Sequence, residues 1–193
     1  MKDWTSSKIV GFGVIKHSPR VVLHIANRPP LDDFQHDISR PLQLGEAASI
    51  IQQTGNHWRK VFSILAKISF SLFDTQCKTW QEYRDTKLLT EQGFEFIAFS
   101  SLAVTTEQHA QNLKQLESDP RPYVSLVCGF SYAQSQLDLL SLVSHQKFEK
   151  LKWSEPHQCL VTPYFDWRQL NNEMLDVVVN IIKSKLDVET LPL

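Results

Sequence analysis

Glycine is scarce in this 193-residue sequence, and the scarcity limits the nucleotide sites that the chain can build. Only six glycines are present. No G-x-x-x-x-G-K phosphate loop occurs, and Gly11-Phe12-Gly13 has only the first two glycines of a G-x-G-x-x-G motif. A G-x-S-x-G motif is also absent. The usual glycine-rich phosphate cradles and the nucleophile elbow of the α/β-hydrolases are therefore not expected.

Cysteine is also sparse, and its spacing argues against disulfides and metal ligands. The sequence contains three cysteines and no C-x-x-C pair, and two of the cysteines lie in apolar runs where a free thiol acts as a small hydrophobe. The seven histidines form no H-x-H or H-x-x-x-H pair. We therefore expect no disulfide framework, no metal site and no other cofactor, and the free thiols favour a reducing, cytoplasmic location.

Long hydrophobic runs and an excess of one charge are missing as well. The longest apolar stretch, residues 61–73, is interrupted by three serines and one lysine, and the N-terminus has no signal-peptide pattern. The formal net charge is −1. We therefore expect that the chain has no membrane partner and does not coat nucleic acid by charge alone. Basic residues can still gather on one face.

Apolar runs and amphipathic segments alternate along the chain. Strands are predicted at residues 21–26, 94–99, 123–128 and 158–161, with an extra edge strand near 9–15. Helices are predicted at residues 45–53, 56–73, 79–85, 105–117, 131–143 and 167–185, and a long loop at 31–44. This alternation implies parallel strands joined by right-handed crossovers. We predict a single α/β domain over residues 1–193, with a three-layer α/β/α fold, a central four-stranded, mainly parallel sheet and a loose tail at 187–193.

Ligands of such sheets usually bind at the carboxyl ends of the strands, so a site is expected there. The candidate pocket residues that follow these ends are Asn27, Arg28, Phe99, Ser100, Tyr164 and Asp166. His24 lies in the middle of the first strand and is expected to be a hydrogen-bonded core residue.

Two further segments allow both a functional and a structural interpretation. Residues 55–60 begin a helix whose free N–H groups and basic side chains can hold an anion, or they form an ordinary helix start with Asn56 as N-cap and Trp58 in the core. Residues 162–168 carry three aromatic side chains that can stack on a flat ligand, or they form a hydrophobic staple with Asp166 as N-cap of the last helix. The basic candidates for a nucleic-acid surface are Arg59, Lys60 and Arg168.

Four stretches near the strand ends form an ordered set of motifs. Residues 124–134 read VSLVCGFSYAQ, an apolar strand with a glycine-containing turn into a helix, and a second apolar strand is followed by Leu102-x-Val104. Asn27-Arg28-Pro29 and Thr162-Pro163-Tyr164 follow the first and last strands. In order and spacing these stretches resemble the motifs of the uracil-DNA glycosylase superfamily over residues 20–182. The resemblance implies a four-stranded parallel sheet flanked by helices, and an ancestry among enzymes that act on DNA bases.

The chain departs from the superfamily pattern at the positions where the resemblance implies catalytic residues. Asn27 or Arg28 stands in place of the catalytic Asp, Phe99 in place of the Asn that reads the base, and Thr162 in place of the His that stabilises the leaving base. Glycosidic cleavage needs an activated water or a stabilised cation on one side and a stabilised leaving base on the other. We therefore expect a catalytically degenerate member whose pocket binds a nucleotide or a nucleic acid.

Two alternatives to this hypothesis stay open. An active DNA glycosylase or small-molecule hydrolase would use Asp166 or Asp32 to activate water. A protein-interaction module would use the loop at residues 31–44 for its contacts.

Overall fold

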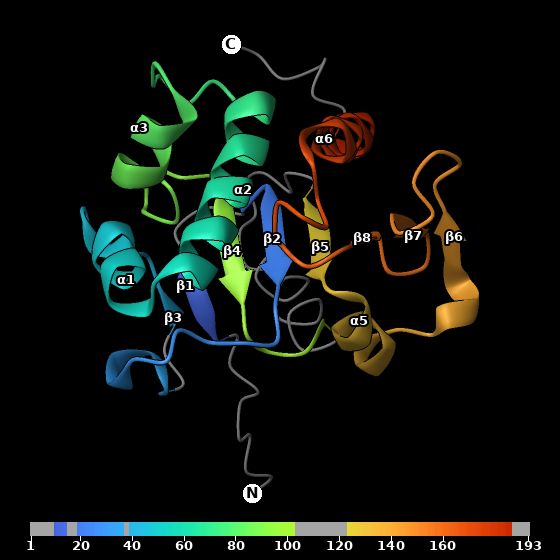
Figure 1. The fold of residues 1–193 in the computed structure, drawn as a ribbon, viewed down its shortest axis with the longest axis horizontal. Coiled ribbons are helices and arrows are strands. Elements are labelled where there is room, and N and C mark those ends of the chain that lie inside the picture. Colours follow the sequence, from blue (N-terminus) through green and yellow to red (C-terminus); the bar gives the residue numbers. More distant parts are fainter. Residues whose placement is uncertain (1–9, 15–18, 37–38, 103–122, 187–193) are drawn as a thin grey trace, which may run out of the picture.

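One mixed β-sheet organises the protein (Figure 1). The computed structural model describes residues 10–14, 19–36, 39–102 and 123–186. Within them the sheet has eight strands in the order β3-β1-β4-β2-β5-β8-β7-β6. The strands are β1 Gly11–Gly13, β2 Val21–His24, β3 Ser39–Arg40, β4 Glu95–Ala98, β5 Val124–Cys128, β6 Leu142–Ser144, β7 Lys152–Ser154 and β8 Cys159–Thr162. The predicted α/β class is confirmed, while the helix predicted at 105–117 and the tail predicted at 187–193 lie outside the described residues.

The four adjacent strands β4, β2, β5 and β8 form the centre of the sheet and run parallel. They are the four strands that the sequence predicts. Every residue in them is buried. A strand buried on both faces contains a nearly continuous apolar run, here with one polar residue in each strand, which is why these strands can be found from the sequence.

The prediction of a four-stranded sheet is wrong in extent, because short strands continue the sheet on both sides. β1 pairs antiparallel with β4 and parallel with β3, while β7 pairs antiparallel with both β8 and β6. Each of these outer strands has only two or three residues. The extra strand predicted near residues 9–15 is confirmed as β1. The other outer strands are too short to show an alternating pattern, so pairing with a neighbour in space, and not local sequence, identifies them.

The segment predicted to be a long loop, residues 31–44, is part of the folded core. It contains the 3₁₀ helix Asp32–Phe34 and strand β3. Phe34 and Leu42 are buried in the main hydrophobic cluster. Deleting this segment would therefore damage the sheet and the core, so a deletion cannot separate a role in partner binding from a role in folding.

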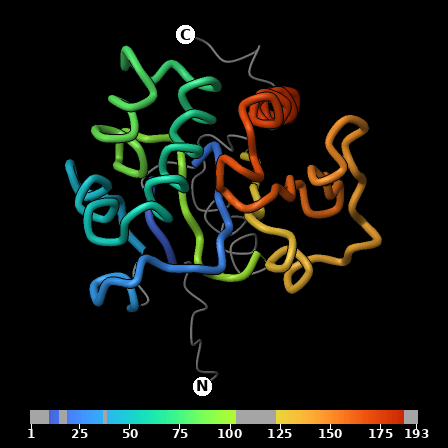
Figure 2. Tube along the Cα trace, viewed as in Figure 1, coloured from blue at the N-terminus to red at the C-terminus, as the bar shows by residue number. Residues whose placement is uncertain are grey.

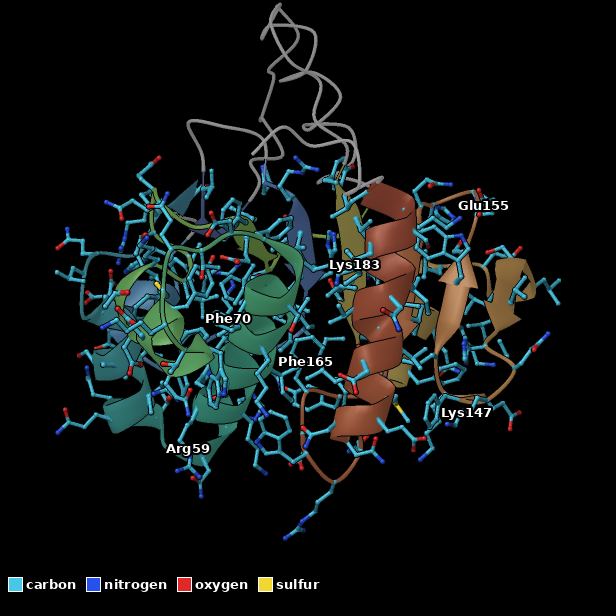
Figure 3. All side chains as sticks on the ribbon, turned by 90° about the horizontal axis from the view of Figure 1, so that it is seen from above. Arg59, Phe70, Lys147, Glu155, Phe165 and Lys183 are labelled. Carbon is cyan, nitrogen blue, oxygen red and sulfur yellow. The ribbon has the colours of Figure 1, made fainter. Side chains whose placement is uncertain are left out.

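Helices lie on both faces of the sheet. Their bounds are α1 Glu46–Thr54, α2 Asn56–Leu72, α3 Trp80–Thr86, α5 Phe130–Gln136 and α6 Asn172–Leu186. α2 and α6 lie side by side on one face (Figure 3), where Phe62 and Val178 join the main cluster. α5 covers the other face, where Ala133 packs with Val127 and Cys159. Figure 2 shows that α1 to α3 lie to one side of β2 and the segment from α5 to β7 to the other.

Two predicted helix boundaries and one predicted cap residue are wrong. α5 ends at Gln136 and not at residue 143, because Leu137 is buried against the sheet in extended backbone with φ −131° and ψ 149°. The next residue, Asp138, then caps the 3₁₀ helix Leu139–Ser141. α6 begins at Asn172 and not at residue 167, and the N-cap position of α2 is occupied by Gly55 and not by Asn56.

His24 is fully buried, and its Nε2 lies 3.3 Å from Oγ of Ser125 on the neighbouring strand β5. The prediction of a hydrogen-bonded core histidine is confirmed. No helix in the described ranges is long and apolar enough to span a membrane.

Candidate functional site

A pocket of about 620 Å³ opens at the carboxyl ends of β5 and β8, and we call it the strand-end pocket. Its floor contains Cys128 and Thr162, the last residues of these two strands, both of which are buried. The turn into α5, the turn after β8 and the connection between β6 and β7 supply the walls. The pocket lies at the edge of the sheet where the sequence predicts a site.

Three aromatic side chains line the strand-end pocket: Phe130, Tyr132 and Tyr164. Phe130 is 43% exposed, which leaves part of its ring open to a ligand. The hydroxyl oxygen of Thr162 is buried and has no hydrogen-bond partner among the described residues. A buried hydroxyl without a partner is destabilising, so a ligand that hydrogen-bonds to it would recover that free energy.

A hydrogen-bonded chain of side chains holds Tyr164 from the side of α2. The Tyr164 hydroxyl lies 2.7 Å from Nε2 of His57, in the first turn of α2. Burial raises the pKa of Tyr164 to about 12, and a hydrogen bond with the Asn27 side chain opposes that increase. Burial and the Lys60 cation lower the pKa of His57, whereas Asp166 raises it. Nε2 of a neutral His57 can accept a hydrogen bond from the Tyr164 hydroxyl when Nδ1 carries the ring proton.

The predicted pocket residues are brought together only in part. Tyr164 lines the strand-end pocket, and Asn27 contacts it. Arg28 lies over the ring of Phe99, 5.8 Å from its centroid, and Nη1 of Arg28 donates to the backbone oxygen of Gln35 at 3.1 Å. The Ser100 hydroxyl accepts from the backbone N–H of Val10 at 3.4 Å. Arg28, Phe99 and Ser100 therefore support loops beside the pocket and do not line it.

Asp166 forms an ion pair and caps a turn. Its Oδ2 accepts from Nζ of Lys60 at 2.5 Å, and its Oδ1 accepts from the backbone N–H of Arg168 at 2.9 Å. The hydrogen bond from Lys60 is the main cause that lowers the pKa of Asp166. The predicted N-cap role is wrong, because Oδ1 of Asn171 accepts from the N–H of Met174 in the first turn of α6.

Of the three basic residues predicted to bind nucleic acid, two line a pocket and one does not. Arg59 and Lys60 line a second pocket, of about 270 Å³, between α2 and α3. Arg168 is exposed and does not line it. In the described parts of the chain, no group of three or more His, Cys, Asp or Glu side chains could hold a metal ion.

Sequence reasoning missed several residues of the strand-end pocket. Phe130 and Tyr132 belong to the motif that carries the glycosylase resemblance, so the resemblance could have nominated them. Lys150, in the β6–β7 connection, and Lys152, in β7, also line the pocket. They lie there because β7 pairs with β8, which local sequence does not reveal. His57 carries no signal of its own, because its partner Tyr164 is 107 residues away.

These features define an α/β domain with an aromatic, lysine-bearing pocket at the carboxyl ends of its parallel strands. The chain belongs to a family of unknown function, DUF6942, whose model matches residues 10–183. Neither a curated protein nor a solved structure matches the chain.

Proposed function

We propose that this protein binds a nucleotide, free or as one unit of a nucleic acid, in the strand-end pocket and does not cleave it. The observation that carries the proposal is the placement of three aromatic rings, Phe130, Tyr132 and Tyr164, around a pocket at the strand ends. Planar bases stack on aromatic side chains, and each stacked base is worth roughly 1–3 kcal/mol. A volume of about 620 Å³ lies within the range of small-molecule sites.

Polar groups around these rings suit the rest of a nucleotide. Gln169 at the wall is exposed and offers an amide that can bind the edge of a base. The buried hydroxyl of Thr162 at the floor has no partner among the described residues and becomes available to a base if the floor opens slightly. Lys150 and Lys152 lie at the pocket and can bind a phosphate. Nζ of Lys152 is 5.6 Å from the ring centroid of Phe130, which keeps this cation beside the stacking surface.

The glycosylase resemblance supports the same proposal. The resemblance implies four parallel strands flanked by helices, and β4, β2, β5 and β8 have this arrangement. Two of the stretches on which it rests, residues 128–132 and 162–164, line the strand-end pocket.

The charged groups support binding without hydrolysis. Glu149 is the one carboxylate among the described residues that line the strand-end pocket, and its side chain is exposed. Asp166 is held by Lys60, and Asp32 lines a different pocket beside Asp33 and Glu46. Neither Asp is therefore placed to activate a water on a ligand in this pocket.

The test is calorimetric titration with a panel of nucleosides and nucleoside 5′-monophosphates. We expect at least one base to bind, and Phe130→Ala to weaken that binding about tenfold because a stacking surface is lost. Leu140→Ala is the matched control: Leu140 is 95% exposed and does not line the pocket, so its truncation should leave the affinity unchanged. If no member of the panel binds, or if both variants bind as the wild type does, the proposed pocket is wrong.

Base release distinguishes the active-enzyme alternative. Oligonucleotides that contain uracil, hypoxanthine or a thymine mismatch are incubated with protein that has been shown to be folded, and the free base is measured. We expect no release. Release that is lost in Asp166→Asn or Asp32→Asn would instead establish the hydrolase alternative.

A further inference from the structure

The second pocket, between α2 and α3, combines three cations with two indole rings. It is lined by Arg59, Lys60, Ser63, Trp80, Arg84 and Trp167, and we call it the tryptophan pocket. None of these residues lines the strand-end pocket. Arg59 lies in the first turn of α2 and points away from the body of the protein (Figure 3).

Arg84 is held rigidly at this site. Its Nε and Nη2 donate to the two carboxylate oxygens of Asp85 at 2.7 and 3.0 Å, and its Nη1 donates to Oγ of the buried Ser63 at 3.1 Å. Its guanidinium carbon lies 5.5 Å from the ring centroid of Trp80. These contacts use three of the five N–H groups of an arginine, and the other two have no partner among the residues that the structure describes. A guanidinium fixed in this way loses little conformational entropy when it binds a ligand.

Lys60 and Arg59 add donors to the same pocket. Nζ of Lys60 has one ion-pair partner, Asp166, and keeps further N–H groups. Arg59 is exposed, and no described residue forms an ion pair with its side chain. Three lining cations face only two paired carboxylates, Asp85 and Asp166, so the site keeps a positive charge.

The two indoles make the site more selective than a solvated basic patch. Trp80 and Trp167 form apolar walls, and Nζ of Lys67 lies 5.2 and 4.2 Å from their ring centroids on the adjoining surface. Apolar walls exclude water and lower the local dielectric constant, which strengthens each charge–charge interaction inside. Planar guanidinium groups match the oxygens of a phosphoryl group in a bidentate manner.

We propose that the tryptophan pocket is a binding site for a phosphate monoester, separate from the strand-end pocket. A monoester carries a charge of roughly −1.5 to −2 at pH 7 and three strong acceptor oxygens, which fit the donors of Arg59, Lys60 and Arg84. A phosphodiester of a nucleic acid has the same phosphoryl chemistry but only one negative charge, so it binds more weakly.

The experiment titrates inorganic phosphate and methyl phosphate into the full chain by calorimetry at constant ionic strength. We expect both to bind, and Arg59→Gln to weaken binding at least fivefold. Arg168→Gln is the matched control, because Arg168 is also an exposed arginine, next to Trp167 in the sequence, but does not line the pocket. Arg84→Gln should abolish binding, and Arg59→Gln keeps the test valid if the Arg84 variant does not fold.

The outcomes separate this proposal from the strand-end pocket. A nucleoside has no phosphate, so its binding should be the same in Arg59→Gln as in the wild type whether or not the tryptophan pocket binds phosphate. Absence of phosphate binding, phosphate binding that Arg59→Gln leaves unchanged, or equal weakening by Arg59→Gln and Arg168→Gln, would overturn the proposal. Dimethyl phosphate that binds as tightly as methyl phosphate would overturn the assignment to a monoester and point to a nucleic-acid backbone.

Discussion

The imidazole of His24 lies in the centre of the parallel sheet, and its burial makes folding sensitive to acid. Burial lowers the pKa of His24 from 6.5 to about 4. The unfolded chain therefore takes up a proton at a higher pH than the folded chain does. The contribution of His24 to stability is complete above pH 6.5 and is lost as the pH falls towards 4. The full loss is about 3 kcal/mol, at 1.36 kcal/mol per pKa unit.

The prediction is that His24→Gln makes the free energy of unfolding less dependent on pH. Between pH 7 and pH 4.5 the wild type should lose about 2 kcal/mol more than this variant. Denaturant unfolding at the two pH values measures the difference. Other groups, such as Glu46, whose pKa is lowered, act equally in both proteins and cancel in the comparison. The control is His157→Gln, an exposed histidine, which should behave as the wild type does. Equal losses in wild type and His24→Gln would contradict the assignment.

Tyr164 and His57 predict a second pH effect, this time on ligand binding. The pKa of His57 is lowered, so His57 is neutral at pH 7 and accepts a hydrogen bond from the Tyr164 hydroxyl. Protonation of His57 in acid reverses this hydrogen bond: the imidazolium then donates to the Tyr164 oxygen, and the hydroxyl proton of Tyr164 turns towards another acceptor at the pocket. We expect nucleoside affinity to change as the pH is lowered and His57 becomes protonated, and this pH dependence to disappear in Tyr164→Phe. Calorimetry from pH 5 to pH 8 tests this, and a pH profile unchanged in Tyr164→Phe would argue against the coupling.

The junction between α1 and α2 depends on the backbone of one glycine. Gly55 ends α1 and precedes α2 with φ +74° and ψ −147°, a region that is almost restricted to glycine. Gly45, before α1, has φ +82° and ψ −10°, which other residues tolerate better. A Cβ at either position would meet no atom within 4 Å. Any effect of Gly→Ala therefore comes from backbone strain and not from a clash.

The backbone angles of the two glycines predict which Gly→Ala substitution costs more stability. Gly55→Ala should destabilise by about 1–3 kcal/mol and Gly45→Ala by about 1 kcal/mol. Thermal unfolding of the two variants gives the comparison. If Gly45→Ala is the more damaging of the two, the backbone argument fails.

At the level of elements, the sequence predicts what is local and apolar. β2, β4, β5 and β8 are found because each is a short run buried on both faces, and α2 because its apolar residues recur at helical spacing. Of the outer strands, β1 falls within the extra strand predicted near 9–15, whereas β3, β6 and β7 are missed because two or three residues contain too little pattern. The start of α6 is misplaced because the turn at Asp166 resembles a helix cap in sequence.

In the candidate site, too, the residues next to core strands are predictable and those brought in by distant segments are not. Tyr164 and Asn27 are predicted because they follow core strands, whose carboxyl ends meet at one edge of a parallel sheet. Phe99 and Ser100 also follow a core strand but turn to other partners, Arg28 and Val10. Lys152 enters the strand-end pocket only because β7 pairs antiparallel with β8. Pairing between segments distant in sequence therefore decides which polar residues reach the site.

The order of strands across the whole molecule places its two pockets. The four parallel strands are in the middle and short strands flank them, so in the described part of the chain the edges are β3 and β6, of two and three residues. Short edge strands offer few unpaired backbone groups to another chain. β5 and β8 carry the strand-end pocket, while the tryptophan pocket lies between the helices that cover one face. His57 links the two pockets: it lies 2.7 Å from the Tyr164 hydroxyl, and the charge of Lys60 lowers its pKa.

This arrangement predicts how two ligands act together on stability. A ligand at ten times its Kd stabilises the folded state by about 1.4 kcal/mol, so a nucleoside and inorganic phosphate at that level should together contribute about 2.8 kcal/mol. Additivity is expected because the two pockets share no lining residue among those described. Denaturant unfolding with each ligand alone and with both provides the measurement. A joint effect that departs from the sum by more than about 0.5 kcal/mol would show that the route through His57 couples the pockets. In that case His57→Ala should restore additivity, because it removes the contact with Tyr164 that links the two sites.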